Sequence, residues 1–425
     1  MLLLMVLESA GAATIQATPQ NYLSRIAPLK PGDTLLLAPG VYRQGLPLHG
    51  LQGEAGNPIV ISGGNDTLNG TIFLGRLGAN TVSIKNSAYL VVRSLVLDGA
   101  GLPVDAVKAE GTSQFAHHIT LERLTIINHG RDQQIAGIST KCPAWSWVIR
   151  ANLIQGAGTG IYLGNSDGSA PFIGGLIEKN LIVNSIGYDL QIKHQLSRPN
   201  EIGMPVETMQ TVIRHNVFSK ADGGSSGQMA RPNVLLGHFP LSGAGMEDSY
   251  AVYGNFFYEN PNEALLQAEG NVAIHDNIFF SSQGDAVRIV PHKSLPQRIE
   301  VEHNTVVAKE SGIVISGADS RFFQRVSLNA VFAARPILGG MQNDNVTGTF
   351  SVAGQYLHAP FAAAGRMDFS PRADSLHMKQ RDAGGVPTLH TDFFGRQFQE
   401  SAAGAVAAGQ AAPWHLGLAI QPDKP

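Results

Sequence analysis

A lysine, a tyrosine and an arginine lie in or beside three of the short apolar segments of this chain. Lys193 ends the segment DLQIK, Tyr162 lies within GIYLG, and Arg231 precedes NVLLG. A lysine whose pKa is lowered by neighbouring cations can remove a proton, a tyrosine can donate one, and an arginine neutralises a carboxylate. These residues predict proton transfer on an anionic ligand, with Lys193 as the base, Tyr162 as the acid and Arg231 as the neutralising cation.

Further polar residues surround these three in the predicted arrangement. His194 and His238 are alternative bases, because imidazole titrates near neutral pH. An outward lysine on a protein surface is more often a solvated charge, so the cluster is a stronger prediction than any single residue. For substrate binding we expect the nearby side chains Lys141, Gln191, Arg288 and Trp145.

The apolar segments that carry the candidates predict short parallel β-strands. Ile, Leu or Val occupies every second position in segments such as GIYLG, DLQIK, AVRIV and GIVIS. When apolar residues alternate with other residues along a strand, one set of side chains faces a core and the other set faces outward. The predicted inward pairs are Ile161/Leu163, Leu190/Ile192, Val287/Ile289 and Ile313/Ile315.

Stacking these segments by their inward pairs places the outward side chains in columns. One column is expected to contain Ser139, Tyr162, Gln191, Leu266, Arg288 and Val314. The neighbouring column is expected to contain Lys141, Gly164, Lys193, Ala268, Val290 and Ser316. The columns bring the candidate base and acid onto adjacent coils of one surface.

An asparagine that recurs before or inside an apolar run predicts the scaffold. Successive asparagines are separated by 28, 36, 39, 22, 27 and 25 residues. Repeats in this range indicate a solenoid, and stacked asparagine side chains can hydrogen-bond to one another at a turn. We therefore expect a structural ladder made of Asn152, Asn180, Asn216, Asn255, Asn277, Asn304 and Asn329.

The two longest intervals in this series indicate where function lies. The intervals of 36 and 39 residues carry extra sequence next to the segments DLQIK and NVLLG. Loops longer than a turn requires are often functional. The surface beside 189–194 and 231–238 is therefore the predicted site.

Composition agrees with many short strands joined by tight turns. Charged residues make up 15% of the chain, apolar residues 43%, and 48 of the 425 residues are glycine. The single cysteine, Cys142, excludes an internal disulfide and a cysteine-based metal cage. One long solenoid can use the whole chain.

Four regions are expected along the chain. Residues 1–13 contain an apolar run followed by small residues and are interpreted as a truncated signal peptide. An N-terminal cap and first strand, 14–56, include a predicted amphipathic helix at 14–29. The parallel β-helix spans 57–355, and a closing segment with a trailing tail spans 356–425.

The opening PGDTLLLAPGVYRQG, followed by GNPIVISG, resembles the N-terminal cap and first coil of secreted β-helix proteins of the pectate-lyase-like superfamily. The segment TDFFGRQF is similar to the TDFxGxxR tail segment common in these proteins, although ESAAGAVAAG replaces the usual acidic and aromatic ending. The resemblance covers nearly the whole chain. It implies an all-β, right-handed parallel β-helix solenoid with a short N-terminal capping helix.

The resemblance also implies an exported carbohydrate-active protein, and the cationic candidates favour a polysaccharide lyase or epimerase acting on uronate. No complete signature of polygalacturonases, of the alginate lyase and chondroitinase B group, or of mannuronan epimerases is present, so the family stays open. One alternative is a glycoside hydrolase using Glu263 and Asp285, which occupy equivalent turns on adjacent coils. A non-catalytic polysaccharide-binding protein is another.

The expected partner is a polysaccharide, and no cofactor is certain, although calcium is a candidate that the resemblance leaves open. A net charge of −3 gives no electrostatic reason to expect nucleic acid. After the N-terminus no stretch approaches the ~20 apolar residues needed to cross a bilayer. The expected location is secreted or periplasmic, and the oligomeric state stays undetermined.

Overall fold

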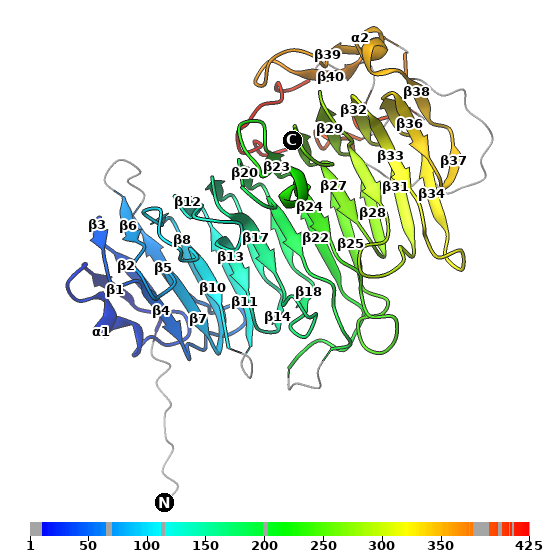
Figure 1. Ribbon diagram of the computed structural model, residues 1–425. Coiled ribbons are helices and arrows are strands. Elements are labelled where there is room, and N and C mark those ends of the chain that lie inside the picture. The colour runs from blue at the N-terminus through cyan, green and yellow to red at the C-terminus, as the bar shows by residue number, and fades with distance from the viewer. Residues whose placement is uncertain are drawn as a thin grey trace, which may run out of the picture.

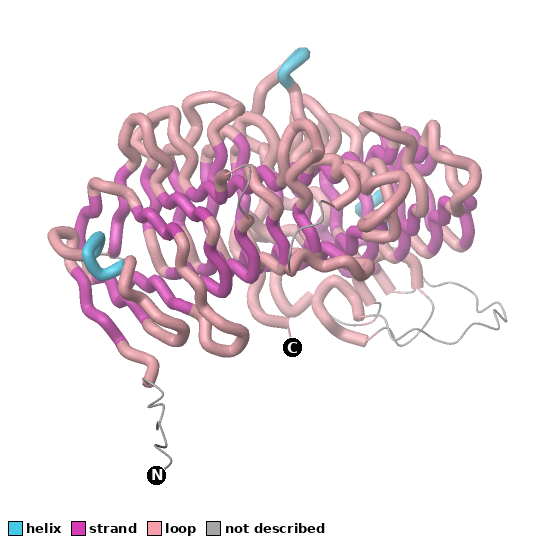
Figure 2. The backbone as a smooth tube through the Cα atoms, turned by 90° about the horizontal axis from the view of Figure 1, so that it is seen from below, coloured by secondary structure: helices cyan, strands magenta, loops and turns pink. Residues whose placement is uncertain are grey.

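Three parallel sheets wind along one axis and form a long solenoid (Figure 1). The computed structural model describes residues 11–64, 70–111, 115–198, 203–373, 375–376, 391–397, 402–407, 409 and 412–424. The expected signal peptide lies mostly outside the described residues. Each turn of the chain contributes one strand to each sheet, and Figure 2 shows the strands as rows along the body.

Sheet A contains, in spatial order, β1 (Thr14–Ala17), β2 (Thr34–Leu37), β5 (Ile59–Gly63), β8 (Ser87–Arg93), β11 (Ala116–Glu122), β15 (Val148–Arg150), β19 (Leu176–Glu178), β22 (Gln210–Arg214), β25 (Ser249–Tyr253), β28 (Val272–His275), β31 (Ile299–Glu302), β34 (Gln324–Ser327) and β37 (Met341–Asn343). Two short strands, β14 (Ala144–Trp145) and β18 (Phe172–Ile173), extend it beside β11.

Sheet B contains β3 (Gly40–Tyr42), β6 (Thr71–Leu74), β9 (Val96–Asp98), β12 (Thr125–Ile127), β16 (Leu153–Gln155), β20 (Leu181–Val183), β23 (Val217–Ser219), β26 (Phe256–Tyr258), β29 (Ile278–Ser281), β32 (Thr305–Ala308), β35 (Ala330–Phe332) and β38 (Val346–Gly348).

Sheet C contains β4 (Leu46–His49), β7 (Val82–Lys85), β10 (Val107–Ala109), β13 (Ala136–Thr140), β17 (Thr159–Leu163), β21 (Leu190–Ile192), β24 (Val234–Leu236), β27 (Leu266–Ala268), β30 (Val287–Ile289), β33 (Ser311–Ile315) and β36 (Arg335–Leu338). The remaining elements are α1 (Tyr22–Ile26), η1 (Gly227–Met229), η2 (Phe350–Val352), α2 (Ala353–Tyr356) and the hairpin β39 (Leu357–Ala359) and β40 (Asp368–Pro371).

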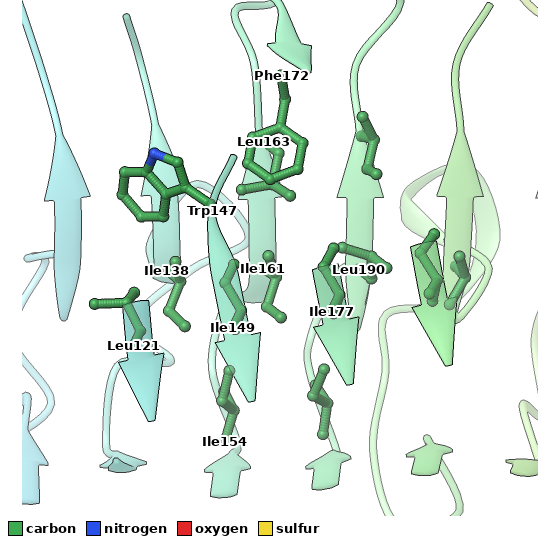
Figure 3. Packing of buried hydrophobic residues seen from close by; sticks show 14 of the residues in the cluster. Leu121, Ile138, Trp147, Ile149, Ile154, Ile161, Leu163, Phe172, Ile177 and Leu190 are labelled. Carbon is green, nitrogen blue, oxygen red and sulfur yellow. The ribbon is translucent and has the colours of Figure 1, made fainter. Parts of the chain in front are cut away.

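Branched apolar side chains from all three sheets fill the interior of the solenoid. Figure 3 shows Ile149 and Ile177 of sheet A packing with Ile154 of sheet B and Ile161 of sheet C. The predicted inward pairs are confirmed, because all eight of their side chains are buried. Stacking like side chains between coils removes a continuous apolar column from water, which is the main stabilising contribution to the scaffold.

The predicted asparagine ladder is confirmed and is one rung longer than expected. The seven predicted asparagines are fully buried between sheets A and B. In each step one Nδ2 donates to the Oδ1 of the next asparagine, from 2.9 Å between Asn152 and Asn180 to 3.0 Å between Asn329 and Asn345. Each Oδ1 also accepts a backbone N–H from the coil before it, as in Asn216 to Asn255 at 2.9 Å. The ladder therefore satisfies groups that the turn removes from the sheets.

The N-terminal cap differs from the predicted helix over 14–29. Its first residues form β1, which pairs with β2, and only Tyr22–Ile26 is helical. The Tyr22 hydroxyl donates to the carbonyl of Gly45 at 2.6 Å and its ring packs edge-on against Tyr42. Strand β1 covers the edge of β2, whose backbone N–H and C=O groups would otherwise be exposed at the first coil.

The C-terminal segment folds back over the outer surface of sheet B rather than trailing away from it. Phe369, Phe393 and Leu416 pack there on outward side chains such as Phe256 and Ile278. Gln421 Nε2 donates to the carbonyls of Asn216 and Gly254, and the chain ends beside the middle coils (Figure 1). From β23 to β35, sheet B therefore carries apolar side chains on both faces, because both faces are covered there.

Among the described residues, no helix is long and apolar enough to cross a membrane.

Replacing Asn255 by Ala should lower the free energy of unfolding by about 2–4 kcal/mol. The change leaves the N–H groups of Asn216 and the carbonyl of Ile213 without their buried partners. Chemical denaturation measures the loss. Asn262→Ala, on an exposed turn, is the control and should change stability by less than about 0.5 kcal/mol. A ladder variant as stable as this control would contradict the structural role.

Candidate functional site

A cleft of about 400 Å³ lies on the outer surface of sheet C, over β10, β13, β17 and β21. We call it the sheet C cleft. Its lining is almost entirely polar and comprises Asn80, Pro103, Asp105, Lys108, Gln133, Gln134, Ile135, Ala136, Ser139, Lys141, Thr159, Tyr162, Ser166, Tyr188, Gln191, Lys193 and Arg231. Five of the nine residues expected in the site therefore meet in one cleft: Lys141, Tyr162, Gln191, Lys193 and Arg231.

The register of sheet C accounts for this meeting. Ser139 pairs with Tyr162, and Tyr162 pairs with Gln191, so their side chains share one outward column as predicted. Further along, the prediction is wrong by one residue, because Leu266 and Ala268 face the core and Gln267 and Glu269 take their outward places. The segment ALLQA has consecutive leucines, which leave its alternation ambiguous, and a slip of one residue exchanges the two faces.

Two lysines flank the Tyr162 ring in the cleft. Lys141 Nζ lies 3.5 Å from the ring centroid, and Lys193 Nζ lies 5.9 Å from it. The Tyr162 hydroxyl is 2.9 Å from Ser166 Oγ. An ammonium over an aromatic face gains a cation–π attraction, but this attraction does not neutralise its charge.

The cleft holds cations without matching carboxylates. Within the described part of the chain, Lys141, Lys193 and Arg231 form no ion pair. The one carboxylate in the lining, Asp105, accepts the Ser139 hydroxyl at 3.0 Å and lies 3.5 Å from Lys108. Arg231 Nη1 donates to the carbonyls of Gln228 and Ala230, which carry no charge to balance it. Partly buried cations without a carboxylate partner are unfavourable in a free protein, so an anionic ligand would be favoured here.

Burial perturbs the titration of the two groups suited to proton transfer. Burial, with a smaller contribution from Lys108, lowers the pKa of Lys141 to about 8. The pKa of Lys193 is lowered too, mainly by burial and to a smaller extent by the nearby Lys293. Burial raises the pKa of Tyr162, which keeps the phenol protonated at neutral pH. Lys141 is therefore better suited than Lys193 to act as the base.

Arg231 is positioned by groups that the sequence analysis missed. Its carbonyl accepts hydrogen bonds from the buried Lys220 Nζ at 2.7 Å and from Asn260 Nδ2 at 2.9 Å. The loop before Arg231 also contacts the cleft residue Gln133, whose Nε2 donates to the Met229 carbonyl at 2.8 Å. The long insertion thus folds over sheet C and delivers Arg231 to the cleft.

Lys220 and Asp189 are two buried charged side chains that influence each other electrostatically. Burial lowers the pKa of Lys220 to about 8 and raises that of the fully buried Asp189. Asp189 immediately follows Tyr188, whose ring lies 6.0 Å from the Arg231 guanidinium. An apolar repeat does not indicate which lysine will be buried. The only sequence feature connected with Lys220 is that it lies in the longest interval between ladder asparagines.

Four expected site residues do not line the cleft. His194 and His238 stack on each other with ring centroids 5.4 Å apart and are not among the residues that line the cleft. Arg288 bonds Asp285 at 2.8 Å, three coils further along. Trp145 is only 1% exposed and stacks on His117 beside sheet A, so the expectation that it offers a face to a sugar is wrong.

The predicted hydrolase pair, Glu263 and Asp285, lacks the environment of a general acid, and the described residues show no cluster of carboxylates for a cation. Asp285 accepts bonds from Arg288 and from the Ser311 N–H; burial alone would raise its pKa, but these bonds lower it, which does not suit a general acid. Glu263 bonds Gln267 and its own chain. Among the described residues no three His, Cys, Asp or Glu side chains gather as a cation site.

Comparisons with known proteins agree with the architecture. Residues 136–327 match the family model described as right handed beta helix region. No curated protein sequence matches this chain. The predicted right-handed parallel β-helix with a short N-terminal helix is confirmed.

Solved structures are similar in fold at low identity. A variant of the PL6 family alginate lyase AlyGC has a TM-score of 0.50 and 13% identity, covering 96% of this chain and 59% of its own. An alginate lyase from Paenibacillus has a TM-score of 0.43 and 16% identity, covering 78% of this chain and 99% of its own. The GH136 lacto-N-biosidase from Eubacterium ramulus has 0.42 and 12%, covering 79% and 68%. The likeness to AlyGC agrees with the β-helix fold.

Replacing Lys220 by Met should lower the free energy of unfolding by about 3–5 kcal/mol, because it leaves Asp189 as a lone buried charge. Thermal and chemical denaturation measure the effect. Lys220→Met combined with Asp189→Leu removes both charges and should recover part of the stability. If the double variant were no more stable than the single one, the two groups would not be coupled.

Proposed function

We propose that this chain is a polysaccharide lyase or epimerase that acts on a uronate-containing polysaccharide. The observation that carries the proposal is a cleft lined by Tyr162 and by three cations without carboxylate partners, Lys141, Lys193 and Arg231. A uronate supplies the missing negative charge. Neutralising its carboxylate acidifies the proton on the neighbouring carbon, C5.

In the proposed reaction Lys193 and Arg231 hold the uronate carboxylate. The free amine of Lys141 removes the C5 proton, and the Tyr162 phenol gives its proton to the glycosidic oxygen on C4. The C4–O bond breaks as the C4=C5 double bond forms. Lys141 then carries the proton that left C5, Tyr162 is a phenolate, and proton exchange with solvent restores both groups.

The epimerase alternative shares the first step. After Lys141 has removed the proton, a proton returns to C5 on the opposite face of the ring and no bond to oxygen breaks. Both reactions place the same demand on the cleft, and the product distinguishes them. A protein exported to the cell surface or periplasm, as the sequence suggests, would meet such polymers.

Incubation with alginate, pectate and unsulfated glycosaminoglycans should generate ultraviolet absorbance from the unsaturated sugar for at least one polymer. Lys141→Met should reduce kcat about 10²–10⁴-fold, the usual contribution of a general base. Lys30→Met, on the exposed cap, is the matched control and should leave the rate unchanged. New reducing ends without absorbance would favour a hydrolase. Binding with neither signal and with inverted C5 in the recovered polymer, seen by proton NMR, would favour the epimerase, and binding with none of the three changes would favour a non-catalytic role.

The pH dependence of kcat/KM should report Lys141. Its amine is active when deprotonated, so the rate should rise with pH through about 8 and level off above it. Because burial raises the pKa of Tyr162, the decline at high pH should begin above the ordinary range of tyrosine. The residual activity of Lys141→Met should not rise with pH near pH 8. If kcat/KM of this variant still rose there, the rise would belong to another group.

A further inference from the structure

Three arginines surround one buried carboxylate where the chain turns from sheet A into sheet B. Glu122 Oε1 lies 3.6 Å from Arg93 Nη1 and 3.2 Å from Arg123 Nη2, and Glu122 Oε2 lies 2.7 Å from Arg150 Nη2. The next carboxylate along this column, Glu178, pairs with the arginine of the following coil at 2.7 Å. Among the described residues, three positive charges therefore share one negative charge at this turn.

Two of these arginines, Arg93 and Arg123, line a cleft of about 510 Å³ at the same turn, which we call the turn cleft. Its lining also includes Leu95, Val96 and Thr125, which lie in or just before β9 and β12. The sheet C cleft lies on another face of the solenoid, so a ligand in the turn cleft leaves the sheet C cleft open.

The early coils differ from the later coils in two ways that open this cleft. Register places Leu95 and Leu124 at the positions that the ladder asparagines occupy from Asn152 onward. The C-terminal segment packs on later strands of sheet B than β9 and β12. The turn cleft is therefore lined by apolar side chains beside its two guanidinium groups, and the C-terminal segment does not fill it.

Both guanidinium groups are held in place and still have donors to offer. Arg93 Nε donates to Ser62 Oγ at 3.3 Å, and Arg123 Nη2 donates to Glu122 Oε1 at 3.2 Å. The side chains of Arg93 and Arg123 remain 38% and 58% exposed. Because a guanidinium carries several N–H donors in a planar fork, each arginine can bind an oxyanion without releasing Glu122.

The size and lining of the cleft favour an anion that is carried on a larger body over a bare inorganic ion. Val96 is half-buried and lines the same cleft as the arginines, so it can pack against the C–H groups of a sugar ring. Apolar side chains with a few polar groups that fix orientation are the usual lining of sites for small organic ligands.

We propose that the turn cleft is a second, non-catalytic binding site for an acidic polysaccharide. Arg93 and Arg123 hold one oxyanion group of the polymer, a carboxylate or a sulfate, and Val96 packs on the sugar that carries it. A polymer held here has a raised effective concentration near the sheet C cleft. The choice of a sugar rests on the function proposed above, whereas the choice of an anion rests on the arginines alone.

Oligosaccharide binding to a protein whose sheet C cleft is disabled tests the second site. Lys193→Gln combined with Arg231→Gln removes two cations from the sheet C cleft and leaves the turn cleft intact. Isothermal titration calorimetry should still detect binding of a hexauronate or of a sulfated hexasaccharide of uncharged sugars, and the tighter of the two identifies the oxyanion. Adding Arg123→Gln should weaken this binding about tenfold or more, the effect of lost charged hydrogen bonds.

Arg150→Gln in the same background is the matched control, because it removes another partner of Glu122 from outside the cleft. At physiological ionic strength it should change the affinity by less than about twofold, since salt screens charges beyond contact. Residual binding that Arg123→Gln leaves unchanged, or weakens no more than Arg150→Gln does, would overturn the second site. Binding of inorganic sulfate as tight as that of either oligosaccharide would overturn it too.

The same titrations separate this proposal from the function proposed above. Binding to the unmodified protein that disappears in the disabled background would overturn the second site alone. Binding at the turn cleft by a protein that alters no polymer would contradict the proposed function alone. Binding of neither oligosaccharide to either protein would overturn both.

Discussion

Hydrogen bonding between successive coils is the constraint on which the rest of this structure depends. The parallel sheets repeat one strand spacing along the whole solenoid, and the buried asparagine ladder keeps the turn between sheets A and B in step with them. An outward side chain is therefore fixed by its register and by the number of coils that separate it from its neighbours. Insertions alter the turns and leave this spacing intact, which is why Lys141 and Lys193 flank Tyr162 although 52 residues separate them in the sequence.

The cleft uses the stability of this scaffold to hold an unfavourable charge distribution. Lys141, Lys193 and Arg231 are drawn together on one surface, and burial weakens the protonated state of both lysines. A buried lysine, Lys220, donates to the Arg231 carbonyl and so fixes the backbone there, and the buried Asp189 lies close enough to interact with this lysine electrostatically. Such arrangements are expected at functional sites, where local cost is offset by the surrounding fold. The core, the ladder and the covered face of sheet B supply that offset.

The sequence predicted what depends on periodicity. The asparagine ladder, the inward pairs and the shared column of Tyr162 and Gln191 all follow from alternation and repeat length. The same reasoning failed where periodicity was ambiguous or absent. Because Leu265 and Leu266 are consecutive, the predicted register of that strand was wrong by one residue. Trp145 lies in a two-residue strand, and no pattern in the sequence indicates that it is buried.

Long-range packing was also beyond reach of the sequence. The outward Phe256, Ile278 and Phe280 pack on a segment about a hundred residues later, and no local pattern indicates that contact. Lys220 and Asp189 were missed for a related reason. A charged residue inside a solenoid is a departure from the repeat, and only the three-dimensional arrangement shows that the two departures lie near each other and support Arg231.

The most direct test of this account is the titration of the lysine side chains by nitrogen-15 NMR, with Lys141 assigned from the Lys141→Arg variant. The account predicts that Lys141 titrates near pH 8 in the free protein. An acidic oligosaccharide should then shift the resonances of Lys141 and Lys193 and leave that of Lys30 unchanged. An ordinary lysine pKa at Lys141, together with no response to any acidic oligosaccharide, would contradict the claim that these unpaired cations form a site for uronate.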